Sequence, residues 1–145
     1  YEALRLPDGN AAPSSDASLI GRWPAFLSSP PVMALLRRIA GADDIAFADG
    51  QATAYSPGDF LTGHDDAVQG KHRRAAYVFS LNPVWRPEWG GLLLFHSDGD
   101  QVRGIVPGFN RLDVFKVPQM HSVSMVTPAV PNRRYSITGW LRATG

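Results

Sequence analysis

The chain has 145 residues, and its 14 Lys and Arg against 13 Asp and Glu give a formal net charge of +1 at pH 7. This length suits a single domain, the near-neutral charge offers no basic surface to attract nucleic acid directly, and the 44% hydrophobic content excludes a disordered chain. The absence of cysteine excludes disulfides, thiolate metal sites and cysteine nucleophiles, so any metal would need His and carboxylate ligands.

Residues 1–43 are predicted to form an N-terminal arm and a supporting helix. Turn-forming residues dominate residues 1–22, which predicts an irregular arm. The run Ser28-Ser29-Pro30-Pro31 places hydroxyl N-cap candidates before prolines of a first helical turn, and hydrophobic residues then recur at helical spacing until Gly41. We therefore predict a helix over about Pro31–Ala40 that covers a sheet, with one or two such supporting helices in all.

From Asp44 onward the hydrophobic pattern becomes that of short strands separated by Gly- and Pro-containing turns. The strand-like runs are Ile45–Ala48, Ala52–Tyr55, Ala75–Leu81, Gly91–Phe95, Leu112–Val117, Ser122–Val126 and Arg134–Leu141. Strands at this density after one or two helices predict a mainly β fold, a two-sheet antiparallel barrel or jelly roll. Residues 44–145 would form this core within a single domain overall.

Two of the four histidines lie in contexts that suit a metal. His64 and Asp66 are two residues apart in an extended segment, so both side chains would project to one face while Asp65 turns away. His121 precedes a strand-like run and would supply a third ligand. Two His and one carboxylate form the triad that binds Fe(II) and leaves positions open. The alternatives are a surface histidine beside two aspartates and a buried histidine hydrogen-bonded at a strand end.

The last predicted strand carries a candidate anion site. Arg134, Ser136 and Thr138 alternate, so they would share one face. A guanidinium and a hydroxyl that point into a small barrel are costly unless an anion binds them. The planar fork of Arg grips a carboxylate with two parallel hydrogen bonds. The alternative for Arg134 is an ordinary surface ion pair.

Together these motifs resemble the signature of 2-oxoglutarate- and Fe(II)-dependent oxygenases. The signature consists of His64-x-Asp66, His121 and Arg134-x-Ser136. The surrounding sequence at residues 55–61, 73–79, 85–95 and 134–140 is similar to that of the prolyl 4-hydroxylase-like branch of this family. Within that branch it is most similar to the catalytic domain of enzymes that hydroxylate a proline of a small-subunit ribosomal protein. The likeness covers about residues 44–142.

The resemblance implies a double-stranded β-helix, which is a cupin-like jelly roll, with the catalytic Fe(II) bound by His64, Asp66 and His121. It implies that Arg134, Ser136 and Tyr55 bind the cosubstrate 2-oxoglutarate. The implied activity is a dioxygenase that uses O2, with ascorbate as reductant, to hydroxylate a C–H bond and release succinate and CO2. The implied substrate is a prolyl residue of a protein or peptide, ribosomal in the enzymes that it most resembles.

One position departs from this pattern, and three alternatives stay open. Ser80, before Leu81, stands where prolyl hydroxylases often have a tyrosine that contacts 2-oxoglutarate. The alternatives are the same chemistry on a free amino acid or small metabolite, a non-catalytic metal- or ligand-binding barrel, and a cupin-like enzyme with another metal. Outside the signature, His72 and His96 are predicted to face solvent. Trp85, Arg86 and Trp89 are expected either to border the mouth of the site or to cap the barrel.

The remaining expectations concern where the protein acts. The longest hydrophobic runs have five residues, whereas a membrane-spanning helix needs ~20, so we expect no membrane association. No basic stretch followed by an apolar one marks a secretory signal, although the chain starts at Tyr1 instead of Met. We therefore predict a cytoplasmic protein by default. The sequence indicates no particular oligomeric state.

Overall fold

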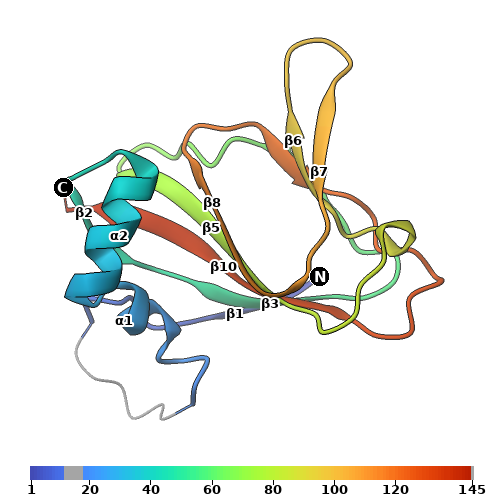
Figure 1. The fold of residues 1–145 in the computed structure, drawn as a ribbon, viewed down its shortest axis with the longest axis horizontal. Coiled ribbons are helices and arrows are strands. Elements are labelled where there is room, and N and C mark those ends of the chain that lie inside the picture. The colour runs from blue at the N-terminus through green and yellow to red at the C-terminus, as the bar shows by residue number, and fades with distance from the viewer. Residues whose placement is uncertain (12–17, 145) are drawn as a thin grey trace.

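Two antiparallel sheets face each other in the computed structural model, which describes residues 1–11 and 18–144 (Figure 1). In chain order the elements are β1 (Glu2–Arg5), α1 (Trp23–Leu27), α2 (Pro30–Ala40), β2 (Ile45–Ala48), β3 (Gln51–Tyr55), β4 (Leu61–His64), β5 (Arg73–Leu81), the short 3₁₀ helix Pro87–Trp89, β6 (Leu93–His96), β7 (Val102–Ile105), β8 (Phe109–Lys116), β9 (His121–Val123) and β10 (Arg134–Ala143).

From β3 onward the chain crosses repeatedly between the two sheets, and only β6 and β7 are consecutive in the same sheet. The major sheet has the order β1-β3-β10-β5-β8, with β2 also paired to β10, and the minor sheet has the order β4-β9-β6-β7. In Figure 1 the hairpin of β6 and β7 extends beyond the rest of the minor sheet. This arrangement confirms the predicted mainly β, double-stranded β-helix fold with one or two supporting N-terminal helices.

The helices cover the face of the major sheet that points away from the minor sheet. Met33 and Leu36 of α2 pack with Tyr77, Ile137 and Leu141 in the larger hydrophobic cluster. The alternate residues of the same strands, such as Ala76 and Val78, line a cavity on the inner face. A smaller cluster, built around Tyr55, Val123, Val126 and Val130, lies between the sheets.

The ends of α2 follow the sequence only in part. The helix begins at Pro30, and Gly41 ends it in the left-handed region at φ 62°. Ser29 is the N-cap residue, but its side chain makes no capping hydrogen bond. Its Oγ donates instead to the carbonyl of Phe26 in the preceding helix, at 2.6 Å. The prediction of a helix was therefore right, and the prediction of a hydroxyl cap was wrong.

Three strands lack the pattern that predicts a strand. The arm predicted as irregular contains β1, which pairs with β3 from Glu2↔Ala54 to Arg5↔Gln51. β1 is an edge strand with all four residues exposed, so no buried face leaves an alternating signature. β4 and β7 are also short, and neither contains a buried residue. Pairing with neighbours makes these segments strands.

The proposed division at residue 43 stays a prediction, and β1 pairs across it with β3. Among the helices of residues 1–11 and 18–144, none is long and apolar enough to cross a membrane.

Candidate functional site

A group of three metal-ligand side chains forms where β4 ends and β9 begins. β4 and β9 are antiparallel neighbours in which His64 lies directly opposite His121, so the two imidazoles meet with ring centroids 4.2 Å apart. Asp66 follows two residues after His64 and turns back at φ 64°. One ligand atom from each of the three residues lies within 4.8 Å of the others.

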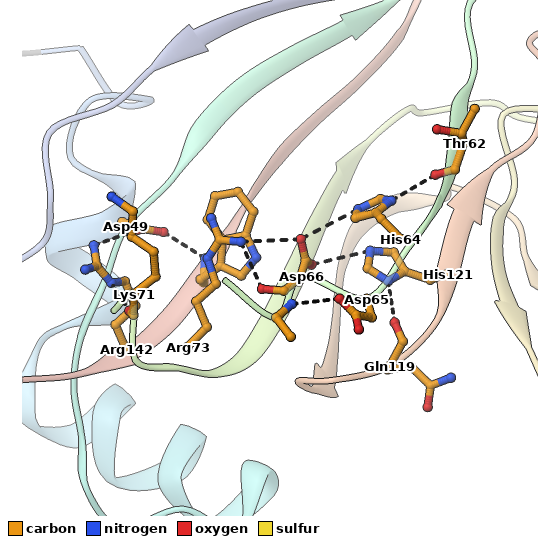
Figure 2. Close-up of polar contacts among 12 residues, drawn as sticks. Asp49, Thr62, His64, Asp65, Asp66, Lys71, Arg73, Gln119, His121 and Arg142 are labelled. Atoms are coloured by element: carbon orange, nitrogen blue, oxygen red, sulfur yellow. Dashed lines mark hydrogen bonds and ion pairs between the residues drawn. The ribbon is translucent and has the colours of Figure 1, made fainter. Parts of the chain in front are cut away.

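The donor atoms of this group point to a common centre (Figure 2). Asp66 Oδ1 lies 3.6 Å from His64 Nε2, and Asp66 Oδ2 lies 3.4 Å from His121 Nε2. The other ring nitrogens face backbone carbonyls, with His64 Nδ1 2.9 Å from Thr62 O and His121 Nδ1 2.7 Å from Gln119 O. Because a carbonyl only accepts, each Nδ1 donates and leaves the Nε2 lone pair free. Two imidazoles and a carboxylate with free donor atoms fit a divalent iron ion.

Burial keeps the His121 ring in the form that binds metals. The ring of Phe115 packs edge-on against it, with centroids 4.7 Å apart. Burial is the main cause that lowers the pKa of His121, with the nearby His64 acting in the same direction. The neutral imidazole, which is the metal-binding form, is therefore favoured at neutral pH. Asp65 turns away, as predicted, and accepts a hydrogen bond from the Ala67 amide at 3.0 Å.

A cavity of about 290 Å³ connects this group to Arg134. The three ligands lie on its minor-sheet side, and Tyr55, Arg134 and Trp140 of the major sheet line it as well. Arg134 is only 1% exposed. Its Nε donates to Gly91 O at 2.8 Å and its NH1 donates to Ser136 Oγ at 3.0 Å.

The charge of Arg134 has no counter-ion in the part of the chain that the structure describes. No carboxylate of residues 1–11 or 18–144 lies within ion-pair distance of its guanidinium. Burial lowers the pKa of Arg134 to about 10, so the group stays charged at neutral pH. A buried cation that lines a cavity and lacks an anion suits a ligand that carries its own carboxylate.

Ser136 and Tyr55 occupy different positions around this guanidinium. The ring of Tyr55 lines the cavity, and the Arg134 guanidinium carbon lies 5.2 Å from its centroid. Burial is the main cause that raises the pKa of Tyr55, so its hydroxyl remains a proton donor. Ser136 does not line the cavity; its Oγ contacts Arg134 and lies 2.9 Å from Thr53 Oγ1. Ser80 pairs with Ser136 in the strand register and is 1% exposed, also outside the lining.

One of the predictions for residues outside the signature needs correction, and another is decided between its two alternatives. His72 is exposed, as predicted, but His96 is half-buried and its Nε2 lies 2.7 Å from Ser122 Oγ. Trp85 and Trp89 are not among the residues that line the cavity of the three ligands. They pack against the smaller hydrophobic cluster between the sheets, which agrees with capping the barrel.

Sequence reasoning missed three residues that shape the site. Gly91 accepts the Arg134 hydrogen bond, Trp140 lines the cavity, and Arg73 contacts Asp66. Arg73 and Trp140 lie within segments already similar to prolyl hydroxylases, but only the folded chain brings them to the triad. A double glycine such as that at 90–91 is typical of a bend, but nothing in the sequence connects it to Arg134.

Comparisons of sequence give one family. The family model described as the 2OG-Fe(II) oxygenase superfamily matches residues 50–142, which contain every predicted site residue. The prolyl 3-hydroxylase OGFOD1 of Mus musculus is 31% identical over 115 residues, 74% of this chain and 21% of that protein. The prolyl 3-hydroxylase sudestada1 of Drosophila melanogaster is 32% identical over 108 residues, 65% of this chain and 20% of that protein. This chain thus spans about a fifth of the length of these relatives.

Solved structures share the fold. A prolyl-4-hydroxylase from Pseudomonas putida matches with a TM-score of 0.74 and 22% identity, over 92% of this chain and 70% of that one. A prolyl hydroxylase from Trichoplax adhaerens, solved with a hypoxia inducible factor peptide fragment, matches with a TM-score of 0.55 and 26% identity, over 68% of this chain and 44% of that one.

Proposed function

Because this chain belongs to the 2OG-Fe(II) oxygenase superfamily, we propose that it catalyses the hydroxylation of a prolyl residue in a protein. The observation that carries the proposal is a single cavity with three iron-ligand side chains on one side and, on the other, a buried Arg134 that has no counter-ion among the described residues. A metal that binds one end of a dicarboxylate and a guanidinium that binds the other would use both features together.

Each residue has a defined task in this proposal. His64, Asp66 and His121 would hold Fe(II), and Arg134 would pair with the distal carboxylate of 2-oxoglutarate. Ser136 and the Gly91 carbonyl hold the guanidinium in place, so Ser136 would act through Arg134. When bound, the iron and 2-oxoglutarate supply the oxidative chemistry that inserts one atom of O2 into a C–H bond and yields succinate and CO2. Ascorbate would serve as the reductant that keeps the iron ferrous.

The exposure of the ligand group supports a macromolecular substrate. The His64 side chain is 35% exposed, whereas Asp66 and His121 are each 7% exposed. The site therefore opens toward solvent on the His64 side, where a loop of another protein has room to approach. We propose a proline of a small-subunit ribosomal protein as the first substrate, on the motif likeness described above. The names of the two curated relatives favour the 3-position of the ring. A ribosomal substrate would fit the cytoplasmic location that we also propose.

The test begins with the cofactors and ends with the product. Fe(II) and 2-oxoglutarate are added anaerobically, and the weak visible charge-transfer band of the chelate is recorded. We expect the band in the wild type and in His72→Ala, whose histidine is exposed and outside the group. It should be lost in His121→Ala. A wild type that binds Fe(II) and gives no band would overturn the 2-oxoglutarate site.

Proline-containing peptides of ribosomal proteins are then added with O2, with and without ascorbate. We expect succinate and a peptide heavier by one oxygen atom, in which amino-acid analysis separates 3-hydroxyproline from 4-hydroxyproline. Succinate release that depends on a free amino acid, with no peptide oxidised, would replace the protein substrate with a small molecule.

A further inference from the structure

We propose that Arg73 is a positioning residue that orients the carboxylate of Asp66 relative to the two histidines and supports the Trp140 wall of the cavity. This inference rests on the proposed function, because it assigns Arg73 a task at the proposed iron site. Arg73 does not line the cavity itself, so it would act through Asp66 and Trp140.

The first observation is the contact of Arg73 with the Asp66 segment. Arg73 NH1 donates to the main-chain carbonyl of Asp66 at 3.0 Å and lies 3.7 Å from Asp66 Oδ1. Asp66 lies beyond the end of β4 at a positive φ of 64°, where no strand ladder fixes its backbone. Arg73 therefore provides a hold on this residue from a different strand, β5 (Figure 2).

The second observation is the stacking of the same guanidinium on Trp140. The Arg73 guanidinium carbon lies 3.5 Å from the centroid of the Trp140 ring, which lines the cavity. The Trp140 amide donates at 2.9 Å to Oδ1 of Asp49, a carboxylate that is 3% exposed. A planar guanidinium can stack through its face while it donates through its edge. Arg73 thus connects the ligand segment of one sheet to a cavity wall of the other.

The third observation is the cost of this placement. The Arg73 side chain is 14% exposed, and its Nε is buried without a hydrogen-bond partner among the described residues. An unsatisfied buried donor is unfavourable. The next residue, Arg74, shows the ordinary arrangement, since its partly exposed side chain makes a bidentate pair with Asp44 at the surface. An arginine that served only the stability of the fold could form a surface ion pair of this kind, without the cost of burial.

Charge and orientation predict opposite effects on metal binding. A positive charge close to the site repels a divalent cation, so removal of the Arg73 charge alone would tighten metal binding. Loss of a group that orients a ligand weakens it, typically by about 10- to 100-fold. The sign of the change therefore separates the two roles.

The experiment measures Co(II) affinity of the metal-free protein by the visible absorption of the bound ion, with no turnover involved. Arg73→Gln should bind Co(II) about 10- to 100-fold more weakly than the wild type. Arg73→Lys should bind Co(II) at least as weakly as Arg73→Gln, because lysine keeps the repulsive charge and lacks the planar fork of the guanidinium. The control Arg74→Gln should stay within about twofold, as expected for an exposed ion pair. Thermal unfolding of each metal-free variant reports whether the fold is kept.

Unchanged or tighter binding in Arg73→Gln, or wild-type affinity in Arg73→Lys, would overturn the positioning role while the iron site stands. If Arg73→Gln does not fold, the lysine variant decides the question. A wild type that does not bind Co(II), or a His121→Ala variant that binds it equally well, would instead remove the proposed function and this inference with it.

Discussion

Arg134 carries a positive charge in a place where the described protein offers no anion to balance it. The side chain is only 1% exposed, and this burial lowers its pKa well below the ordinary value of arginine, to about 10. At about 1.4 kcal/mol per pKa unit, this depression corresponds to about 3 kcal/mol against folding with the charged form. The penalty is fully present at neutral pH, and it disappears as the pH rises from about 10 past the ordinary pKa of arginine, where neither the folded nor the unfolded chain carries this charge. A site that binds a dicarboxylate explains why such a residue is present.

Arg134→Met should therefore stabilise the ligand-free protein while it abolishes 2-oxoglutarate binding. The substitution also removes the hydrogen bonds to Gly91 and Ser136, and each loss costs about 1 kcal/mol of this gain in stability. A net gain of about 1 kcal/mol in the free energy of unfolding remains. Chemical denaturation of the metal-free variant measures it, and the charge-transfer band measures 2-oxoglutarate binding.

Ser136→Ala serves as the comparison, since it removes one partner of the guanidinium and leaves the charge. It should weaken 2-oxoglutarate binding and should not stabilise the protein. A methionine variant that is less stable than the wild type would show that Arg134 already has its charge satisfied.

At the scale of elements, the bend at residues 90–91 sets the position of Arg134. Gly90 forms an isolated bridge with Val126, and both glycines have positive φ, 67° and 62°. A Cβ on Gly91 would lie 2.8 Å from Arg134 Cδ. The bend therefore leads into β6 and also leaves room for the Arg134 side chain. Only glycine combines the positive φ with the absence of a Cβ that this position needs.

Gly91→Ala should weaken 2-oxoglutarate binding by at least about tenfold, because Arg134 must move, which at 1.4 kcal/mol per tenfold corresponds to a cost of at least about 1.4 kcal/mol. Metal affinity should not change, because the three ligands come from other segments, namely β4, the residues just after it, and β9. Titration of 2-oxoglutarate against the Fe(II)-loaded, anaerobic variant measures the effect.

Gly58→Ala is the matched control, since Gly58 has φ 90° and no atom within 4 Å of an added Cβ. It carries the backbone strain of an alanine at positive φ, about 1–2 kcal/mol, without the contact with Arg134. An equal loss of 2-oxoglutarate binding in both variants would mean that backbone strain, and not displacement of Arg134, causes the effect.

At the scale of the whole molecule, the site joins the two sheets. β4 and β9 of the minor sheet bring the three metal ligands, and β10 of the major sheet brings Arg134. Helix α2 packs outside the major sheet and contributes no lining to the cavity. A ligand held at both ends would therefore tie the sheets together.

Metal binding should raise the thermal stability of the protein, and 2-oxoglutarate should raise it further only when metal is bound. At a metal concentration of 100 times Kd the gain is about 2.7 kcal/mol, or about 5–10 °C in Tm for a domain of this size. Differential scanning calorimetry with Mn(II), with and without 2-oxoglutarate, measures both steps.

The metal step should vanish in His121→Ala, and the 2-oxoglutarate step should vanish in Arg134→Met. A 2-oxoglutarate step of the same size without metal would show that the metal and the arginine do not hold one ligand.

The sequence by itself determined the parts that depend on local pattern and on residue type. Helix α2 and strands such as β2 and β10 follow from periodicity and turn residues. The triad and Arg134 were candidates from their residue types, and the resemblance to 2-oxoglutarate oxygenases assigned their roles. The tertiary structure alone decided which segments pair, so β1, β4 and β7 became strands without an alternating pattern. It alone also placed Arg73 against Asp66 and Trp140 in the cavity wall, and turned Ser136 toward Arg134. The physical reason is that a contact between distant segments depends on strand register and on which face a side chain occupies, and both are fixed only when the sheets form.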